Sequence, residues 1–211
     1  MEPPGASDGV PGTLVPMAET IASPPSLPDF PRDRGDRKPL ALTAAARRSG
    51  LGVRPAEASD IPFLRSLFHD LRRPELIAAA CPAALPTAFC DDQFARQHSS
   101  LVSRFPHRDF FVVEHDHQPA GRLYLDRSAG AFHLIEFALT PRVRNRKLGG
   151  RLIESLQLAA RRSRAEGVTL LVEPHNIAAR RFYHRHGFLQ FGQEGSHLAL
   201  RWQPPGRPAR G

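Results

Sequence analysis

Residues 144–150 have the composition of a phosphate-binding loop at the start of a helix. They read Arg-Asn-Arg-Lys-Leu-Gly-Gly and follow an apolar run that ends at Pro141. The free backbone N–H groups at a helix N-terminus bind phosphate without special side chains. Gly149 and Gly150 allow close approach of a ligand to the backbone. The segment therefore predicts a site where main-chain donors and several cationic side chains bind a polyphosphate.

Residues 176–188 form a second segment whose spacing indicates chemistry. Asn176, Ala179 and Tyr183 are separated by three and four residues, so they line one face of a helix that Gly187 ends. The Asn176 amide can reach a ligand, Ala179 leaves room beside the helix, and Tyr183 places a phenol one turn further. An ordinary amphipathic helix with an N-capping Asn and a core Tyr is the alternative interpretation.

The surrounding pattern predicts the elements that position these two segments. Alternating or continuous apolar runs favour strands, and apolar residues three and four apart favour helices. Strands are expected at 51–55, 110–114, 120–126, 132–139 and 168–172, with a hairpin over 189–203. Helices are expected at 60–71, 91–105, 148–164 and 176–187. This order predicts a mixed α/β layer fold.

Taken together, the two segments resemble the GNAT superfamily of acetyl-CoA-dependent N-acetyltransferases. The family pattern at the diphosphate loop is Arg or Gln, two residues, Gly, one residue, then Gly or Ala. Arg144 and Gly149 match its ends, whereas Lys147 stands where the family has Gly. Residues 176–188 match the second family motif at every marked position, and the order of elements is similar over 51–203. The resemblance implies a mixed, mostly antiparallel central sheet of about seven strands with helices on both faces.

The resemblance also implies where acetyl-CoA, the acetyl donor, would bind. It would lie where strands 132–139 and 168–172 separate, with Asn176 and Ala179 beside its pantetheine arm. The implied backbone contacts to the arm and the acetyl oxygen come from Phe137, Ala138 and Leu139. The implied diphosphate site comprises Arg144, Asn145, Arg146, Lys147, Leu148, Gly149 and Gly150.

The implied reaction is direct attack of a neutral amine on the thioester, without a covalent enzyme intermediate. Tyr183 would lie near the sulfur, and its phenol could protonate the leaving thiolate. For the base, Glu136 and His133 on the central strand rank equally, with Glu173 behind them. A regular strand alternates its faces, so Glu136 and His133 would point to opposite sides unless a bulge intervenes. His184 and His186, which flank Tyr183, are expected on the surface.

Composition limits the alternatives. The chain has 29 Lys and Arg against 21 Asp and Glu, a net charge of +8, which attracts anions of any kind. A non-catalytic acetyl-CoA-binding regulatory module of the same fold is the second hypothesis. A nucleic-acid-binding protein ranks lower, because no recognition-helix motif or aromatic-basic platform is present. The acceptor would be an amine of a small molecule or a protein, handled by a monomer or homodimer.

Three regions are expected from composition. Residues 1–50, rich in Pro, Gly, Ser and Ala, are expected to be a disordered tail, 51–204 the acetyltransferase domain, and 205–211 a second disordered tail. No apolar run is long enough to span a membrane, and no secretory signal is evident. Two cysteines, Cys81 and Cys90, favour reduced thiols in a cytoplasmic protein. The ten histidines show no metal-ligand spacing.

Overall fold

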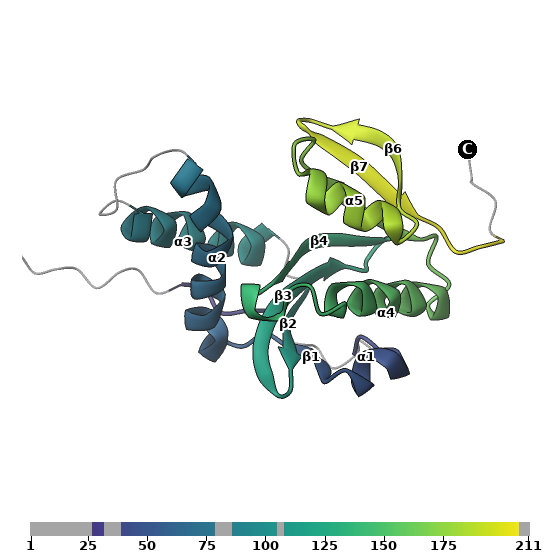
Figure 1. Cartoon of the computed structure of the whole chain (residues 1–211), viewed down its shortest axis with the longest axis horizontal. Helices are drawn as coiled ribbons and strands as arrows, with labels where there is room; N and C mark the ends of the chain where they lie inside the picture. Colours follow the sequence, from purple (N-terminus) through teal and green to yellow (C-terminus); the bar gives the residue numbers. More distant parts are fainter. Residues whose placement is uncertain (1–26, 32–38, 79–85, 105–107, 207–211) are drawn as a thin grey trace, which may run out of the picture.

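A seven-stranded mixed sheet organises the molecule. The computed structural model describes residues 27–31, 39–78, 86–104 and 108–206 (Figure 1). The strands are β1 (Leu51–Pro55), β2 (Asp109–His115), β3 (Gln118–Asp126), β4 (Phe132–Leu139), β5 (Val168–Val172), β6 (Leu189–Glu194) and β7 (His197–Trp202). Their order across the sheet is β1-β2-β3-β4-β5-β7-β6, and every neighbouring pair except β4–β5 is antiparallel. The fold class that the sequence predicted is confirmed.

Helices cover both faces of this sheet. They are α1 (Ala44–Arg48), α2 (Ile61–Ala78), α3 (Pro86–Arg104), α4 (Leu148–Arg162) and α5 (Ile177–Arg185), with short 3-10 turns at Ala58–Asp60 and Pro141–Val143. Leu152 and Leu156 of α4 are buried in the larger core, whereas Leu64 of α2 and Phe94 of α3 are buried in a second core that includes Tyr124 of β3. Among the described helices, none is long and apolar enough to cross a membrane.

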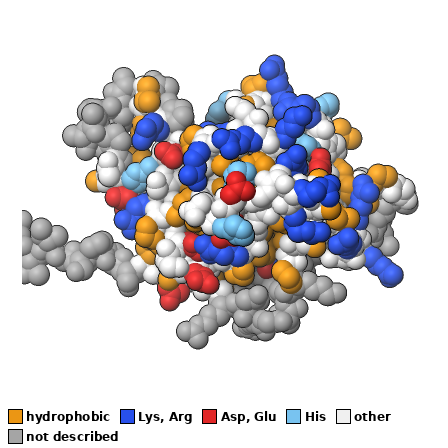
Figure 2. All heavy atoms as spheres, turned by 60° about the horizontal axis from the view of Figure 1, so that its bottom comes forward, with side chains coloured by type: hydrophobic (Ala, Val, Ile, Leu, Met, Phe, Trp, Pro, Cys, Tyr) orange, Lys and Arg blue, Asp and Glu red, His pale blue; other side chains and the backbone are white. Residues whose placement is uncertain are grey.

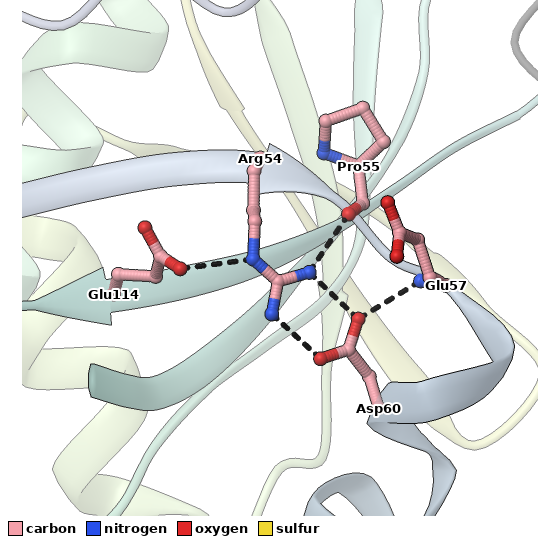
Figure 3. A network of polar contacts seen from close by, with 5 residues as sticks. All are labelled: Arg54, Pro55, Glu57, Asp60 and Glu114. Carbon is pink, nitrogen blue, oxygen red and sulfur yellow. Dashed lines mark hydrogen bonds and ion pairs between the residues drawn. The ribbon is translucent and has the colours of Figure 1, made fainter. Parts of the chain in front are cut away.

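An ion-pair network fixes the start of α2 against the sheet (Figure 3). The Arg54 guanidinium of β1 makes two hydrogen bonds of 2.6 and 2.7 Å to the Asp60 carboxylate and one of 2.9 Å to Glu114 of β2. The Glu57 amide also donates to Asp60. Burial alone would raise the pKa of Asp60, but the hydrogen bonds from Arg54 and Glu57 hold it below its ordinary value. The charged form of Asp60 therefore stabilises this corner.

The N-terminal region corrects one expectation. A disordered segment was expected up to residue 50, yet residues 39–50 pack on the domain, with Leu40, Leu42 and Ala46 in the larger core. Thr43 caps α1 and its amide donates to Ser155 Oγ of α4 at 3.1 Å. The Pro-, Gly-, Ser- and Ala-rich composition around these few apolar residues hid their place in the core. Residues 27–31 are also described, with Phe30 in the second core, whereas residues 1–26, 32–38 and 207–211 lie outside the described residues, as does Cys81.

Candidate active site

Strands β4 and β5 pair over only part of their length. Parallel pairing joins Phe132–Leu134 to Val168–Leu170 and then stops, although β4 continues to Leu139. On its other edge, β4 stays paired with β3 as far as Leu139. From Ile135 onward, the β5-facing edge of β4 thus has main-chain groups without a partner strand. This opening is where the resemblance placed the pantetheine arm.

A bulge in β4 settles the directions of His133 and Glu136. Leu134 pairs with Leu125 and Glu136 with Tyr124, which leaves Ile135 as an extra residue. The Glu136 carboxylate consequently reaches Gln97 of α3, on the face covered by α2 and α3. His133 lies on that same face, because Phe132 and Leu134 beside it pack in the core under α4. The bulge condition that the sequence left open is therefore met.

A cleft of about 810 Å³ lies between the open end of β4, the start of α4 and α5, within the usual size of ligand sites. It is lined by all the residues expected to bind acetyl-CoA except Arg146, and by Tyr183. The expected residues in its walls are Phe137, Ala138, Leu139, Arg144, Asn145, Lys147, Leu148, Gly149, Gly150, Asn176 and Ala179. Segments separated in the sequence by a helix and a strand thus meet around one hollow.

The start of α4 presents backbone donors to this cleft. Lys147, the N-cap residue, makes no side-chain capping bond, and the amides of residues 145–150 donate to no backbone carbonyl of the described residues. Asn145 and Lys147 both have a φ of 61°, in the left-handed region. Asn tolerates that region, whereas Lys incurs a steric cost that Gly avoids. A Gly at this position, as in the family pattern that the sequence resembles, would avoid that cost.

The first turn of α5 and its central Tyr face the cleft as well. The Asn176 side-chain oxygen accepts from the Ala179 amide at 3.0 Å, so its NH₂ group is left to donate to a ligand. The Tyr183 ring packs edge-on against Phe182 and Phe188, at centroid distances of 5.3 and 5.5 Å. Burial raises the pKa of Tyr183, which keeps the phenol protonated at neutral pH.

Glu136 is the most enclosed of the three candidate bases. Its carboxylate pairs with Arg122 at 2.8 Å, accepts from Gln97 Nε2 at 2.6 Å and is 15% exposed. Burial raises the pKa of Glu136, while the charge of Arg122 and the Gln97 hydrogen bond oppose that rise. A carboxylate with a raised pKa is a stronger base toward an ammonium group.

The other two candidates differ from Glu136 in their surroundings. His133 Nδ1 lies 3.0 Å from the Thr169 hydroxyl, and burial together with the charge of Arg108 lowers the pKa of its imidazole. His133 therefore stays neutral at physiological pH. Glu173 is half exposed and lies 3.1 Å from His175, and it does not line the cleft. Its position fits an ordinary surface ion pair better than a buried base.

Several cleft residues were not predicted. Phe182, Arg151, Arg185 and His186 line it, although Phe182 was not part of the predicted stripe and His186 was expected on the surface. A Cβ at Gly150 would lie 2.9 Å from His186 Cε1, so this glycine makes room for the imidazole rather than only for a ligand. Arg151 closes the run of five cationic side chains that begins at Arg142, and this charge cluster was the available signal. The places of Phe182 and His186 depend on how α5 packs against α4.

Comparison with known proteins gives a partial family match and several structures with the same fold. Residues 106–190 match the sequence model of the family described as Acetyltransferase (GNAT) domain. No curated protein matches the chain significantly.

Solved structures share the fold at low sequence identity. The PaiA N-acetyltransferase of Thermoplasma acidophilum in complex with coenzyme A aligns with a TM-score of 0.56 and 16% identity, over 73% of this chain and 99% of its own. An acetyltransferase of Thermus thermophilus aligns with a TM-score of 0.54 and 23% identity, over 72% and 94%. One from Streptococcus agalactiae aligns with a TM-score of 0.51 and 17% identity, over 74% and 99%. Residues 106–190 thus resemble the GNAT acetyltransferase domain in sequence, and the chain shares its fold with these solved acetyltransferases.

Proposed function

We propose that this chain is an N-acetyltransferase, which moves an acetyl group from acetyl-CoA to an amine by direct attack. One observation supports the proposal above all: a single cleft combines an uncapped helix N-terminus, the open edge of β4 and a phenol. These three features match the three parts of the donor that need recognition, namely the diphosphate, the amide-bearing arm and the thioester.

The donor would be bound chiefly by main-chain groups. The amides of residues 145–150 would donate to the diphosphate, helped by the charges of Arg144 and Lys147. The open edge of β4 over Phe137–Leu139 would hydrogen-bond the pantetheine arm as a short additional strand. Asn176 would donate its NH₂ group to the arm, and Ala179 would leave space for it. Many Lys and Arg side chains lie on the face of the molecule in Figure 2, and the net charge of +8 favours a polyanionic donor.

The chemistry follows from the charges that must move. The acceptor ammonium first loses a proton, because only the neutral amine has a lone pair for attack. Its nitrogen then bonds to the thioester carbon, and the developing oxyanion accepts a hydrogen bond from a backbone N–H of β4. The carbon–sulfur bond breaks and the thiolate takes the proton of Tyr183. The nitrogen then loses its second proton to solvent, which leaves a neutral amide, and solvent reprotonates the tyrosinate.

Glu136 is our first candidate for the group that receives the ammonium proton, with His133 second. Glu136 approaches from the α3 side of β4, whereas Tyr183 approaches from the α5 side. Strands β4 and β5 stop pairing after Leu134, and we infer that the acceptor reaches the thioester between them. An acceptor amine that enters on the α3 side would therefore reach the thioester of acetyl-CoA bound on the α5 side.

Calorimetric titration with acetyl-CoA, followed by a thiol-release screen over amines and N-terminal peptides, tests the proposal. We expect binding in the micromolar range and thiol release with at least one acceptor class. Binding without release across a broad panel would favour a regulatory acetyl-CoA-binding module instead. Absence of binding to acetyl-CoA would overturn the proposal.

A further inference from the structure

Residues 27–31, far from the catalytic segments in sequence, pack against α3. Phe30 is 7% exposed in the second core. Its ring lies 4.9 Å from the His98 ring and 5.4 Å from that of Phe110, measured between centroids. A buried aromatic side chain at such distances contributes both apolar burial and ring-edge attraction. Residues 27–31 are thus anchored on the α3 side of the sheet.

His98 joins this segment to α3 by a hydrogen bond. Its Nε2 lies 2.7 Å from the Pro28 carbonyl oxygen, and since a carbonyl only accepts, Nε2 bears the hydrogen. His98 is 5% exposed, and burial lowers the pKa of its imidazole, with the charge of Arg122 adding to this and Asp29 opposing it. The neutral, buried His98 imidazole thus joins residues 27–31 to α3 through one hydrogen bond.

Gln97, the neighbour of His98 on α3, donates to Glu136. That bond measures 2.6 Å, and Arg122 completes the surroundings of the carboxylate. The Gln97 side-chain oxygen is buried without a hydrogen-bond partner among the described residues. Leaving a buried amide oxygen unpaired costs free energy, so packing around α3 must compensate for it. The side chains of two consecutive residues thus connect one turn of α3 to residues 27–31 and to Glu136.

We propose that Phe30 and His98 are positioning residues, which hold the α3 turn so that Gln97 keeps its hydrogen bond to the Glu136 carboxylate. Residues 27–31 would in this way control a carboxylate that lies on another element. The proposal rests on the proposed function only for the catalytic meaning of Glu136. The other claim is that the Gln97–Glu136 hydrogen bond depends on Phe30 and His98. That claim follows from the packing and the distances above, whatever reaction the protein catalyses.

The side-chain amide of Gln97, assigned in NMR spectra with a Gln97→Met variant, tests this dependence directly. In the full chain we expect slow solvent exchange of this amide and a shift that titrates with Glu136. In Phe30→Ala we expect exchange at least about tenfold faster and loss of that titration, because the helix turn no longer holds the amide on the carboxylate. Phe89→Ala is the matched control: it lies on the same helix, is 51% exposed, and should leave both readouts unchanged.

A second pair of variants keeps the test decisive should Phe30→Ala fold poorly. His98→Gln retains an N–H donor for the Pro28 carbonyl and should preserve the Gln97 signal, whereas His98→Leu removes the donor and should lose it. A wild-type Gln97 signal in folded Phe30→Ala and His98→Leu would overturn the proposal.

Acetyl-CoA titration of the same variants separates this inference from the proposed function. We expect unchanged affinity in all of them, because the cleft is bounded by α4 and α5 rather than α3. If no variant, wild type included, binds acetyl-CoA, the proposed function fails while the Gln97 readout still decides the positioning role.

Discussion

Lys147 stands where the family pattern that this chain resembles has Gly. It adopts a φ of 61° at the N-cap of α4, where a side chain with a Cβ is strained. We expect Lys147→Gly to raise the free energy of unfolding by about 1 kcal/mol, because glycine reaches this region without that strain. Urea denaturation measures the change.

Asn145→Gly is the control for this prediction. Asn145 has the same φ of 61°, but Asn occupies this region readily, so its replacement should change stability little. Equal or lower stability of Lys147→Gly would show that the lysine side chain stabilises the loop more than its backbone strain costs.

Tyr183 permits a test of chemistry that is separate from packing. Its ring packs against Phe182 and Phe188, and Phe at this position would retain those contacts. We expect Tyr183→Phe to lower turnover at least about tenfold, because the thiolate loses its proton donor. Acetyl-CoA affinity and melting temperature should stay close to wild type. Unchanged turnover would remove Tyr183 from the acid role.

At the scale of elements, α1 and the residues before it belong to the core. Deleting residues 1–45 removes Leu40 and Leu42 from their contacts under α4, and loss of buried leucines costs about 2–5 kcal/mol each. We therefore expect a large drop in the melting temperature. Deleting only residues 1–26 removes no buried side chain of the described structure and should leave it nearly unchanged. Similar melting curves for both deletions would contradict the packing of residues 39–45.

The Arg54–Asp60 pair gives a second test at this scale. Asp60 is 6% exposed in its side chain, and Asp60→Asn removes one of the two carboxylates that pair with the Arg54 guanidinium. We expect a loss of about 2 kcal/mol in the free energy of unfolding, reduced from the fully buried case because Arg54 is 34% exposed. Asp92→Asn disrupts an exposed pair with Arg96 and should cost almost nothing. Chemical denaturation at pH 7 compares the two.

For the whole molecule, buried histidines predict how stability depends on pH. Burial lowers the pKa of His98, His133 and His186 in the folded state. Below pH 6.5, the ordinary value for histidine, the unfolded chain therefore binds protons that the folded chain resists, and stability falls as pH decreases. Between pH 7 and 5 we expect a loss of about 1–2 kcal/mol in the free energy of unfolding, measured by urea denaturation, chiefly from His98 and His133 because solvent screens the more exposed His186.

Carboxylates extend this dependence to lower pH. Asp60 and Asp126 have a lowered pKa in the folded state, so their contribution is present above about pH 4 and is lost as pH falls further. Burial raises the pKa of Glu136, so Glu136 acts in the opposite direction and offsets part of the loss of stability.

A His98→Gln variant should show a shallower dependence of the free energy of unfolding on pH between pH 7 and 5. An unchanged slope would mean that His98 is not the dominant buried base.

Local periodicity determined much of this protein in advance. The helix over 176–187, the loop at 144–150 and the succession of strands were predictable because their signals lie within single segments. Most residues predicted for the cleft line it, since each motif keeps its own geometry once its helix begins.

Only the tertiary structure decided the direction of Glu136 and the place of residues 39–50. The bulge at Ile135 arises from pairing with Tyr124 and Leu125 on β3, and Thr43 meets Ser155 across 112 residues of sequence. Such partners leave no repeat in the local sequence, because strand register and gap filling depend on which distant surfaces meet. The sequence thus predicts which residue types form the site. Packing of distant elements decides on which face of the sheet each side chain lies.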